Sequence, residues 1–391
     1  MSWELKGLNE LGYISRGRSQ HRPRDAAHLY GGTHPFVQTG DVKHAGLYLT
    51  EYAQTYTEDG LAQSRIWPAG TLCITIAANI ADTAILGFDA CFPDSVIGFI
   101  PDDKKADARF IKYLFDTLLQ RKYKQFTQGA AQDNLSQAKL ISLKFQIPGI
   151  TEQKQIADVI SAYDDLIENN RRRIQLLEES ARLPYKEWFV HLRFPGHEHV
   201  KITDGVPEGW ERKPLNEIAD ITMGQSPKSV YYNQDVKGLP FHQGVSNFGT
   251  RFPSHETYCT VKNRVAEPGD ILFSVRAPVG RINITPNKIV IGRGLAAIRS
   301  NLRQQNFLFY ALKSHFFKED MIGGGAIFAA ITKKDLHGVK ILQPSNKITE
   351  MFMDLALPID LQISNLQELI IGLSQARDLL LPRLMNEEMA V

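Results

Sequence analysis

The sequence predicts an α+β protein in which two mixed α/β domains are held apart by two long antiparallel helices that form a coiled coil. Three observations predict this class. Two stretches repeat apolar residues at heptad spacing, segments rich in β-branched residues precede each stretch, and short motifs recur in the same order in both halves. The chain of 391 residues is therefore expected to be a tandem duplication with pseudo-twofold symmetry.

The first long helix is predicted over residues 151–188 and the second over 347–391. In the first, apolar residues alternate in steps of four and three, and adding 196 to each position gives a second run of the same kind. The predicted helix seam consists of Ile156, Ile160, Tyr163, Ile167, Asn170, Ile174, Leu177, Ile359, Ile363, Leu366, Ile370 and Leu373. Asn170 is polar where its counterpart Leu366 is apolar, so we expect Asn170 to fix the register of the pair.

The first domain is predicted over residues 1–150. Short segments with β-branched and aromatic residues lie between turn signals, and one segment changes to helical spacing. The expected strands cover 47–56, 70–79, 96–101 and 141–148, and the expected helix covers 106–126. This domain is therefore a mixture of short strands with at least one core helix.

The second domain and its connector are predicted over residues 189–346, where the order of motifs repeats. LNEIADITMGQS (215–226) matches LNELGYISRGRS (8–19), and this match pairs Gly224 with Gly17 and Ser226 with Ser19. PFHQ (240–243) matches PFVQ (35–38), and GDILFSV (269–275) matches GTLCITI (70–76). Several matches in the same order indicate a duplicated domain whose loops differ in length.

Composition limits the class of protein. The net charge is only +2, so any nucleic-acid surface has to be a local patch. The three cysteines, Cys73, Cys91 and Cys259, are scattered without CxxC spacing, which argues against a disulfide framework and favours a reducing cytoplasm. The N-terminal segment is polar, and we find no stretch of about 18 uninterrupted apolar residues, so a cytoplasmic protein without membrane spans is expected.

The sequence offers no persuasive catalytic set, and we expect no catalytic residue and no metal. It contains no GxxxxGK[ST] loop for nucleotide phosphates, no strand-linked GxGxxG, and no [ND]PP[YF] motif of amino-methyltransferases. A nuclease centre at Asp94, Asp103 and Lys105 is the strongest alternative, but these residues lie in turn-like sequence. The 197–199 segment (HEH) beside a Pro-Gly turn is more typical of a solvated loop than of a metal site.

Basic and amide side chains cluster at matching places in the two halves. Arginine can bind guanine O6 and N7, glutamine and asparagine can bind adenine N6 and N7, and lysine or serine can hold phosphates. The candidate DNA-binding residues are Arg16, Arg18, Gln20, Arg22, Arg24, Gln225, Ser226, Lys228, Tyr232, Asn233, Arg276, Arg281 and Arg293. The alternative is that these groups only keep the protein soluble, and the recurrence in a duplicated chain favours DNA binding.

Specific motifs of the helices and the connector resemble the specificity subunits of type I restriction–modification systems. The segments that carry the resemblance are ITEQKQIADVISAYD (150–164), ENNRRRIQLLEESARLPYKEWF (168–189), RFPGHE (193–198), GVPEGWE (205–211), GDILFSVRAPVG (269–280) and ARDLLLPRLM (376–385). The resemblance covers essentially the whole chain, and the helix and connector motifs are its specific part. One departure is Pro184, which comes two residues earlier than the position equivalent to Pro382 and leaves the end of the first helix open.

The resemblance implies that residues 1–150 and about 195–346 are two target recognition domains that each read one half of a split, asymmetric site in double-stranded DNA. It implies a non-catalytic subunit that binds two methyltransferase subunits and, with restriction subunits, forms an ATP-dependent nuclease. S-adenosylmethionine, ATP and Mg are expected in those partners, with no cofactor in this chain. A stand-alone DNA-binding regulator with two heads is the alternative from another class.

Overall fold

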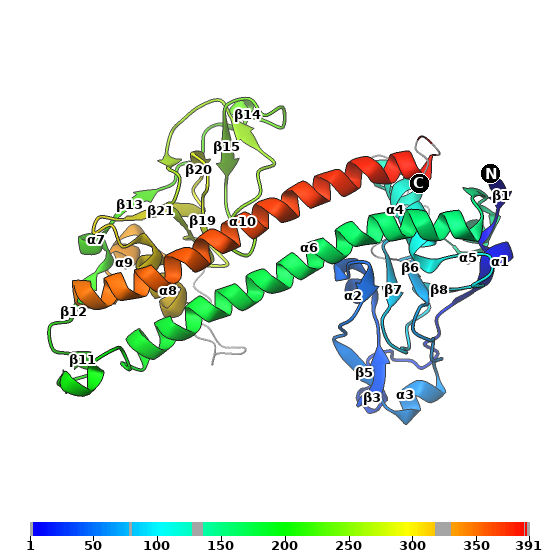
Figure 1. Ribbon diagram of the computed structural model, residues 1–391, viewed down its shortest axis with the longest axis horizontal. Coiled ribbons are helices and arrows are strands. Elements are labelled where there is room, and N and C mark those ends of the chain that lie inside the picture. The colour runs from blue at the N-terminus through cyan, green and yellow to red at the C-terminus, as the bar shows by residue number, and fades with distance from the viewer. Residues whose placement is uncertain (1–2, 78–79, 127–135, 317–329, 387, 389–391) are drawn as a thin grey trace. The chain divides into compact units, whose positions relative to one another are not determined.

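The computed structural model describes residues 3–77, 80–126, 136–316, 330–386 and 388. The chain forms two compact units (Figure 1). Unit 1 is Met1–Arg173 with Leu366–Val391, and unit 2 is Ile174–Asn365. Each unit therefore contains one α/β domain together with a part of each long helix, so the division between the units crosses both helices.

The two long helices are α6 (Ile150–Tyr185) and α10 (Asn346–Met385). At 1.5 Å per residue they are about 54 and 60 Å long. Pro184 does not end the first helix before Tyr185, and a five-residue π-helical turn, η2 (Lys186–Val190), follows it. The predicted pair of long helices is thus present, and each helix begins one residue before its predicted start.

Within each unit the helix segments run antiparallel and share a core. In unit 1, Ile156 and Ile160 of α6 belong to the same apolar cluster as Leu384 and Met385 of α10. In unit 2, Ala181 and Tyr185 of α6 pack in a cluster with Phe352 and Ala356 of α10. Low residue numbers in α6 therefore meet high residue numbers in α10, as an antiparallel pair requires.

The predicted seam faces inward along both helices. Ile156, Ile160, Ile167, Asn170, Ile174, Ile363, Leu366 and Ile370 are buried, and Tyr163, Leu177, Ile359 and Leu373 are half-buried. Asn170 and Leu366 both lie in the buried seam of unit 1. A polar side chain therefore does occupy a core position of the pair, where its amide limits the number of acceptable registers.

In unit 1 the main sheet has five strands in the order β2-β8-β6-β7-β4, and α4 packs on it. All pairs are antiparallel except β4 with β7. The strands of this sheet are β2 (Gly12–Arg16), β4 (Tyr48–Leu49), β6 (Leu72–Thr75), β7 (Thr83–Leu86) and β8 (Val96–Pro101). The other elements are β1 (Glu4–Lys6), α1 (Leu8–Leu11), η1 (Ala27–Leu29), β3 (Tyr30–Phe36), α2 (Thr39–His44), β5 (Gln54–Tyr56), α3 (Glu58–Ala62), α4 (Ala108–Phe126), α5 (Gln137–Ser142) and β9 (Phe145–Ile147).

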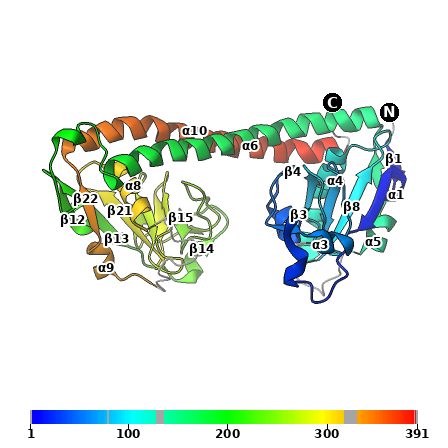
Figure 2. The ribbon, with the colours of Figure 1, turned by 90° about the horizontal axis from the view of Figure 1, so that it is seen from below.

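Unit 2 contains a four-stranded sheet, β13-β21-β18-β19, and a five-stranded sheet, β14-β16-β15-β20-β17. Figure 2 labels β13 and β21 of the first sheet and β14 and β15 of the second. The four-stranded sheet consists of β13 (Ala219–Met223), β18 (Ile271–Ser274), β19 (Ile282–Ile284) and β21 (Leu295–Ser300), all antiparallel. The five-stranded sheet consists of β14 (Tyr232–Asn233), β15 (Leu239–His242), β16 (Tyr258–Cys259), β17 (Val265–Ala266) and β20 (Ile289–Ile291). The remaining elements are η3 (His197–His199), β10 (Ile202–Thr203), β11 (Val206–Pro207), β12 (Glu211–Pro214), α7 (Leu215–Ile218), η4 (Ser229–Tyr231), α8 (Gln305–Phe316), α9 (Lys333–His337) and β22 (Lys340–Gln343).

The internal repeat is visible in the contacts of α4 and α8. Tyr113 of α4 donates a hydrogen bond to Asp164 Oδ2 of α6 over 2.6 Å. Tyr310 of α8 donates to Asp360 Oδ1 of α10 over 2.8 Å. The tyrosines are 197 residues apart and the aspartates 196, so the same tyrosine–aspartate contact joins each domain to its own segment of the helix pair.

Three strand predictions differ from the structure. Of residues 70–79, only Leu72–Thr75 form a strand (β6), and residues 78–79 lie outside the described part of the chain. Residues 47–56 were predicted as one strand, but they form β4 and β5, which pair with β7 and β3 in different sheets. Residues 141–148 begin with the last turn of α5, and only Phe145–Ile147 are extended. Alternating apolar residues do not reveal where a chain leaves one sheet for another, because both strands bury one face. Among the described helices, none is long and apolar enough to cross a membrane.

Candidate nucleic-acid interface

Each domain has a polar edge where corresponding strands of its main sheet end. In unit 1, Gly17 N donates to Val96 O over 2.8 Å, and Arg18 N donates to Phe92 O over 3.0 Å. In unit 2, Gly224 N donates to Leu295 O over 2.9 Å, and Gln225 N donates to Ile291 O over 3.0 Å. These bonds place Arg18 and Gln225 at equivalent positions.

The pairing of the next strand extends this equivalence. Ile76 N donates to Ser95 O over 3.0 Å in unit 1, and Val275 N donates to Gly294 O over 2.9 Å in unit 2. The next residues are Ala77 in unit 1 and Arg276 in unit 2. We call the two regions the first polar edge (Arg16, Arg18, Gln20, Arg24, Gln38, Asp94) and the second polar edge (Gln225, Ser226, Gln243, Arg276, Arg293).

The second polar edge is assembled around Ser226. Its hydroxyl donates to Gln243 Oε1 over 2.7 Å and accepts from the backbone N–H of Arg293 over 3.1 Å. Gly294 lies so close to Gln243 that a Cβ on this glycine would stand 2.4 Å from the Gln243 carbonyl oxygen. Glycine is therefore required for the close approach of the backbone at residue 294 to Gln243. The neighbouring Arg293 side chain is exposed.

Two more predicted arginines lie at the same end of the sheet. Arg276 is exposed two residues after the end of β18, which pairs with β21, the strand that begins two residues after Arg293. Arg281 is exposed at the start of β19, and its N–H donates to Ser274 Oγ over 2.8 Å. The structure thus brings Gln225, Ser226, Arg276, Arg281 and Arg293 together from three loops, although up to 68 positions separate them in the sequence.

The other predicted residues of unit 2 lie in the neighbouring loop. Lys228 is exposed before η4. The Tyr232 ring stacks on Phe241 at 4.5 Å between centroids, and its hydroxyl donates to Pro227 O over 2.8 Å. Asn233 Oδ1 accepts from the N–H groups of Asp235 and Lys237, over 3.1 and 3.0 Å. Tyr232 and Asn233 therefore hold the loop in shape, and a direct DNA contact by either stays a prediction.

At the first polar edge the arginines are engaged by acceptors of the protein. Arg16 Nε donates to the Asp94 carbonyl oxygen over 2.8 Å, and Arg24 forms an ion pair with the Asp94 carboxylate at 2.9 Å. Arg22 Nη1 donates to the carbonyl oxygens of Ser19 and His21, over 2.8 and 2.7 Å. Arg22 therefore stabilises its own loop, Arg16 and Arg24 are held by Asp94, and all three side chains are exposed.

Asp94 and Arg293 occupy equivalent positions with opposite charges. Phe36 bridges Cys91 in parallel, and Phe241 pairs with Val290 in parallel, so Cys91 corresponds to Val290 and the residues three further along are Asp94 and Arg293. A carboxylate accepts hydrogen bonds where a guanidinium donates them. The two edges therefore present different patterns to any common ligand.

Sequence reasoning missed several members of the edges. Gln38 and Gln243 end the matching PFVQ and PFHQ motifs, and Gln38 Nε2 donates to Gln54 Oε1 over 2.6 Å. The motif match pointed to these glutamines, but the strands that bring them to the edge were not predicted. Arg65 was missed as well. Its guanidinium lies over the Trp67 ring at 4.3 Å and over the Tyr13 ring at 5.0 Å. The sequence does not reveal this contact because Tyr13 is far from Arg65 along the chain.

The geometry disfavours the nuclease alternative. Asp94 precedes β8 and Asp103 follows it, so six strand residues separate them by roughly 20 Å. Asp94 is also neutralised by Arg24. The HEH segment forms the short helix η3, and His197 Nδ1 lies 2.9 Å from the carbonyl oxygen of Phe194, which precedes this helix. Across the described part of the chain, no group of three or more His, Cys, Asp or Glu side chains is arranged to hold a metal ion.

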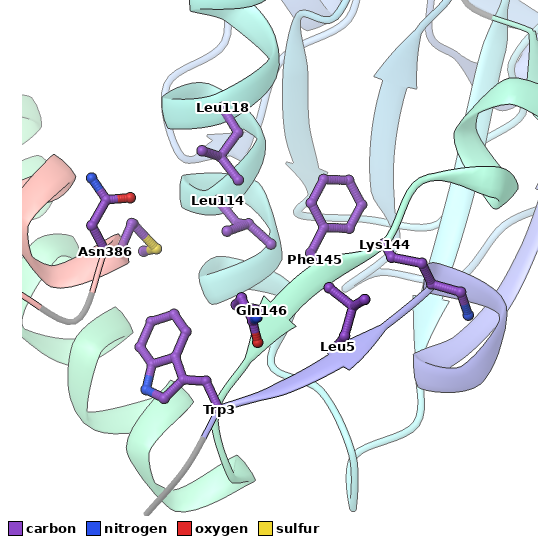
Figure 3. A pocket seen from close by; sticks show the side chains of 9 residues that line it. Trp3, Leu5, Leu114, Leu118, Lys144, Phe145, Gln146 and Asn386 are labelled. Carbon is purple, nitrogen blue, oxygen red and sulfur yellow. The ribbon is translucent and has the colours of Figure 1, made fainter.

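A hollow of about 370 Å³ lies elsewhere in unit 1 (Figure 3). Trp3 and Leu5 from the β1 end, Leu114 of α4 and Phe145 of β9 line it, with Lys144 at its border. The Lys144 ammonium is paired with Glu10. The hollow is mainly apolar and contains none of the predicted DNA-binding residues.

The histidine next to Gln243 makes unit 2 sensitive to acid. Burial and the nearby His255 lower the pKa of His242 from its ordinary 6.5 to about 4, so native His242 is neutral at pH 5. Its Nε2 lies 2.9 Å from His255 Nδ1. Unfolded His242 binds a proton as the pH falls below 6.5, but native His242 does not do so until about pH 4. The unfolded state then holds more protons than the native state between these pH values, so the stability of the native state decreases as the pH is lowered from 6.5 to 4.

We therefore expect His242 to account for a loss of roughly 2 to 3 kcal/mol of unfolding free energy between pH 6.5 and pH 4. Urea unfolding of the full chain across this range measures the loss. In His242→Gln the slope of stability against pH should be shallower, whereas His28→Gln, an exposed histidine of unit 1, should keep it. Equal slopes for His242→Gln and the unchanged chain would contradict the assignment.

The duplicated domains each carry a polar edge with guanidinium and amide groups, the side-chain chemistry that is typical of nucleic-acid recognition proteins. The sequence profile described as "Type I restriction modification DNA specificity domain" matches residues 1–179 and 207–355. The chain belongs to this family. Its function is DNA sequence specificity in a type I restriction–modification system, as a non-catalytic recognition subunit.

Individual relatives agree with the family. A putative type I restriction enzyme MjaX specificity subunit from Methanocaldococcus jannaschii is 39% identical over 251 residues, which cover 62% of this chain and 59% of that relative. The type I restriction enzyme MjaIX specificity subunit of the same organism is 27% identical over 409 residues, which cover all of this chain and 94% of the relative. The crystal structure of an S subunit from M. genitalium has the same fold, with a TM-score of 0.60, 15% identity, and coverage of 98% of this chain and 96% of that one.

Proposed function

We propose that the chain reads a split, asymmetric site in double-stranded DNA, with one polar edge on each half-site, and that it positions two methyltransferase subunits for adenine N6 methylation. The observation that carries the proposal is the equivalence of the two edges. The same backbone hydrogen bonds bring Arg18 and Gln225, and Asp94 and Arg293, to matching places. A duplicated domain with matching edges is suited to binding two segments of one duplex.

The chemistry of the second polar edge suits base recognition in the major groove. Arg276 and Arg293 are exposed, and a guanidinium can donate two hydrogen bonds to guanine O6 and N7. Gln225 and Gln243 are exposed amides, the group that binds adenine N6 and N7. Their backbones are fixed by strand pairing and by Ser226, so little conformational entropy is lost when the edge meets DNA.

The first polar edge has different chemistry, which supports two unlike half-sites. Asp94 stands where the second edge has Arg293, and Ala77 stands where it has Arg276. A carboxylate can accept from cytosine N4, and the neighbouring Arg16, Arg18 and Arg24 can hold phosphates or guanine. An asymmetric site follows if each edge binds the bases that its own side chains complement.

The outer faces of the long helices fit the proposed methyltransferase partners. In unit 2, Leu176 and Leu183 of α6 are 68% and 48% exposed, and Leu357 and Leu361 of α10 are 49% and 57% exposed. Leu176 and Leu183 are seven residues apart and Leu357 and Leu361 are four apart, so each pair lies on one helix face. Exposed leucines in rows of this kind mark a protein interface.

We expect Leu176→Glu to reduce the number of methyltransferase subunits bound per chain, because the new charge would be buried in the interface. The adjacent Gln175→Glu adds the same charge at an exposed polar position and should leave assembly intact. Native mass spectrometry of the co-expressed complex counts the subunits. Equal stoichiometry for the two variants would exclude this face of α6 as the docking surface.

The cofactors of the proposed reaction belong to the partners. S-adenosylmethionine would be bound by the methyltransferase subunits, and ATP and Mg by restriction subunits. The chain itself would supply placement: its edges bind the half-sites, its basic groups neutralise phosphates, and the partners act on an adenine taken out of the base stack.

A gel-shift experiment tests the proposal against a stand-alone regulator. The chain is co-expressed with the methyltransferase encoded beside it, and binding to genomic DNA fragments is measured with and without that partner at fixed salt. Specificity-subunit function predicts weak binding alone and tight, sequence-specific binding with the partner. Equally tight and specific binding by the isolated chain would support the regulator instead.

A further inference from the structure

Arg251 is almost completely buried in unit 2, with 2% of its surface exposed, although it lies in a loop of the recognition domain. Its Nε donates to Glu178 Oε1 of α6 over 2.7 Å, and its Nη1 donates to Asp360 Oδ1 of α10 over 2.5 Å. Its Nη2 donates to the Tyr310 hydroxyl of α8 over 2.9 Å. One guanidinium thus joins a recognition loop to three helices, including both long ones.

The surrounding charges are balanced, which makes this contact specific. Glu178 also binds Lys313 at 3.0 Å, and Asp360 also accepts from Asn306. Burial disfavours the charged form of Arg251, but its hydrogen bonds and the charges of Glu178 and Asp360 outweigh that effect, and the pKa of the guanidinium is raised. A buried ion pair with satisfied hydrogen bonds fixes one geometry, because a displaced partner leaves a charge without solvation.

The loop that carries Arg251 starts and ends at the second polar edge. Residues 244–255, which we call the Arg251 loop, begin directly after Gln243 and end at His255, which contacts His242. Inside the loop, Gly249 exchanges hydrogen bonds with the Asn283 amide, over 3.1 and 3.0 Å, and the Arg251 carbonyl oxygen accepts from Ile284 N over 2.8 Å. These bonds attach its tip to β19.

The base of the loop packs against the strands that form the edge. Val245 and Phe248 contact the apolar cluster that contains Ile291 and Leu295, the residues on either side of the Gly292–Gly294 turn. Gly294 N donates to the Gln243 carbonyl oxygen over 3.0 Å. A continuous set of contacts therefore leads from the helix pair through the Arg251 loop to Gln243 and Arg293.

Unit 1 is built differently at the equivalent place. Asp164, the counterpart of Asp360, forms an ion pair with Arg377 of α10, in which Nη1 and Oδ1 are 2.6 Å apart. The chain after Gln38 forms the short helix α2, which packs on β6 and β7. Both units therefore have an arginine bound to the equivalent aspartate. In unit 1 this arginine belongs to a long helix, and in unit 2 it belongs to a loop of the recognition domain.

We propose that Arg251 is a positioning residue that holds the second polar edge in its reading geometry through the Arg251 loop, and so sets the discrimination of the second half-site without touching DNA. This inference rests on the proposed function for its DNA readout. Its local consequence, the fixed position of Gln243 against Gly294, does not depend on DNA.

The test uses the full chain in complex with its methyltransferase and three variants. Arg251→Met removes the guanidinium, and Arg251→Lys keeps the charge. Arg251→Gln with Glu178→Gln, Asp360→Asn and Lys313→Gln neutralises the whole cluster, so that a variant without the clamp and without a buried unpaired charge is available even if Arg251→Met fails to fold. Arg377→Met is the matched control, because it removes the guanidinium from the equivalent aspartate without touching a recognition loop.

Two readouts are taken, hydrogen exchange at the Gly294 amide and binding to duplexes in which one half-site is scrambled. We expect the clamp-free variants to exchange Gly294 faster and to lose about two- to thirtyfold in second half-site discrimination. Arg251→Lys should retain part of the discrimination at the second half-site. Arg377→Met should change neither Gly294 exchange nor this discrimination, and no variant should change discrimination at the first half-site. Unchanged Gly294 exchange, or an equal loss for both half-sites, would overturn the inference. If the unaltered complex shows no separate half-sites, the proposed function fails, while the Gly294 result still stands.

Discussion

Lengthening both long helices by seven residues should lengthen the unspecified spacer between the half-sites and leave both half-sites unchanged. The insertions belong after Arg173 in α6 and after Asn365 in α10, where the two compact units divide. Seven residues add about 10 Å of helix and turn it by only about 20°, so the seam continues. At 3.4 Å per base pair this corresponds to about three base pairs if DNA runs along the helices, and fewer if it is inclined to them.

The insertion has a built-in control. Each inserted segment carries apolar residues at seam positions and Glu, Lys or Ala elsewhere, so that the paired insertion preserves packing. The same segment in α6 alone would leave seven residues without a partner and put Ile174 and the following seam out of step with α10. Sequencing of methylated DNA from cells with each variant gives the spacer. A changed half-site at unchanged spacer length would contradict the idea that the helices set the separation.

Removal of both exposed arginines of the second polar edge should abolish discrimination at one half-site. A bidentate guanidinium–guanine pair is worth about 1–3 kcal/mol of discrimination, so Arg276→Ala with Arg293→Ala is expected to lower discrimination at the second half-site at least about thirtyfold if both read bases. A base change in the first half-site should lower the affinity of this variant as much as it lowers that of the unaltered complex, because the first polar edge is intact. Binding of the complex to duplexes with single base changes measures both effects.

A control variant at an exposed arginine outside the edge, together with the salt dependence of binding, separates base reading from general electrostatic attraction. Arg212→Ala removes an exposed arginine from β12 in the same unit, away from the edge. It is expected to leave discrimination unchanged. If Arg276 and Arg293 contact only phosphates, the double variant lowers affinity for all sequences alike and reduces the slope of log K against log salt by about two. That result would remove both residues from the base-reading set.

The helices and the repeat were predictable because their signals are local or periodic. The seam follows from the positions of Ile156, Ile160 and Ile167 alone, since a helix that buries one face has to repeat apolar residues every three or four positions. The pairing of Gly17 with Gly224 came from matching motifs, and the backbone bonds of the two glycines confirm it. Each such signal is carried by short segments whose own residue order reveals it, without knowledge of which distant segments are in contact.

The residues that assemble the sites were less predictable because they depend on contacts between distant segments. Arg251 lies 73 residues from Glu178 and 109 from Asp360, and its sequence neighbours resemble an ordinary polar loop. Nothing in the sequence distinguishes this buried arginine from exposed Arg293. Tyr232 and Asn233 show the opposite case, because they were selected for groups that bind nucleic acid and the structure uses those groups within the loop. Tertiary packing decides which of these side chains remain available to contact a ligand and which make contacts within the protein.

The central claim, that two unlike edges read two halves of one site, is tested most directly by the methylated motif in cells that contain this chain and its methyltransferase. The account predicts two specified half-sites of different sequence, separated by a spacer of fixed length and free sequence. It also predicts that the Arg276→Ala, Arg293→Ala variant alters one half only. A single uninterrupted motif, or a change in both halves with that variant, would contradict the account.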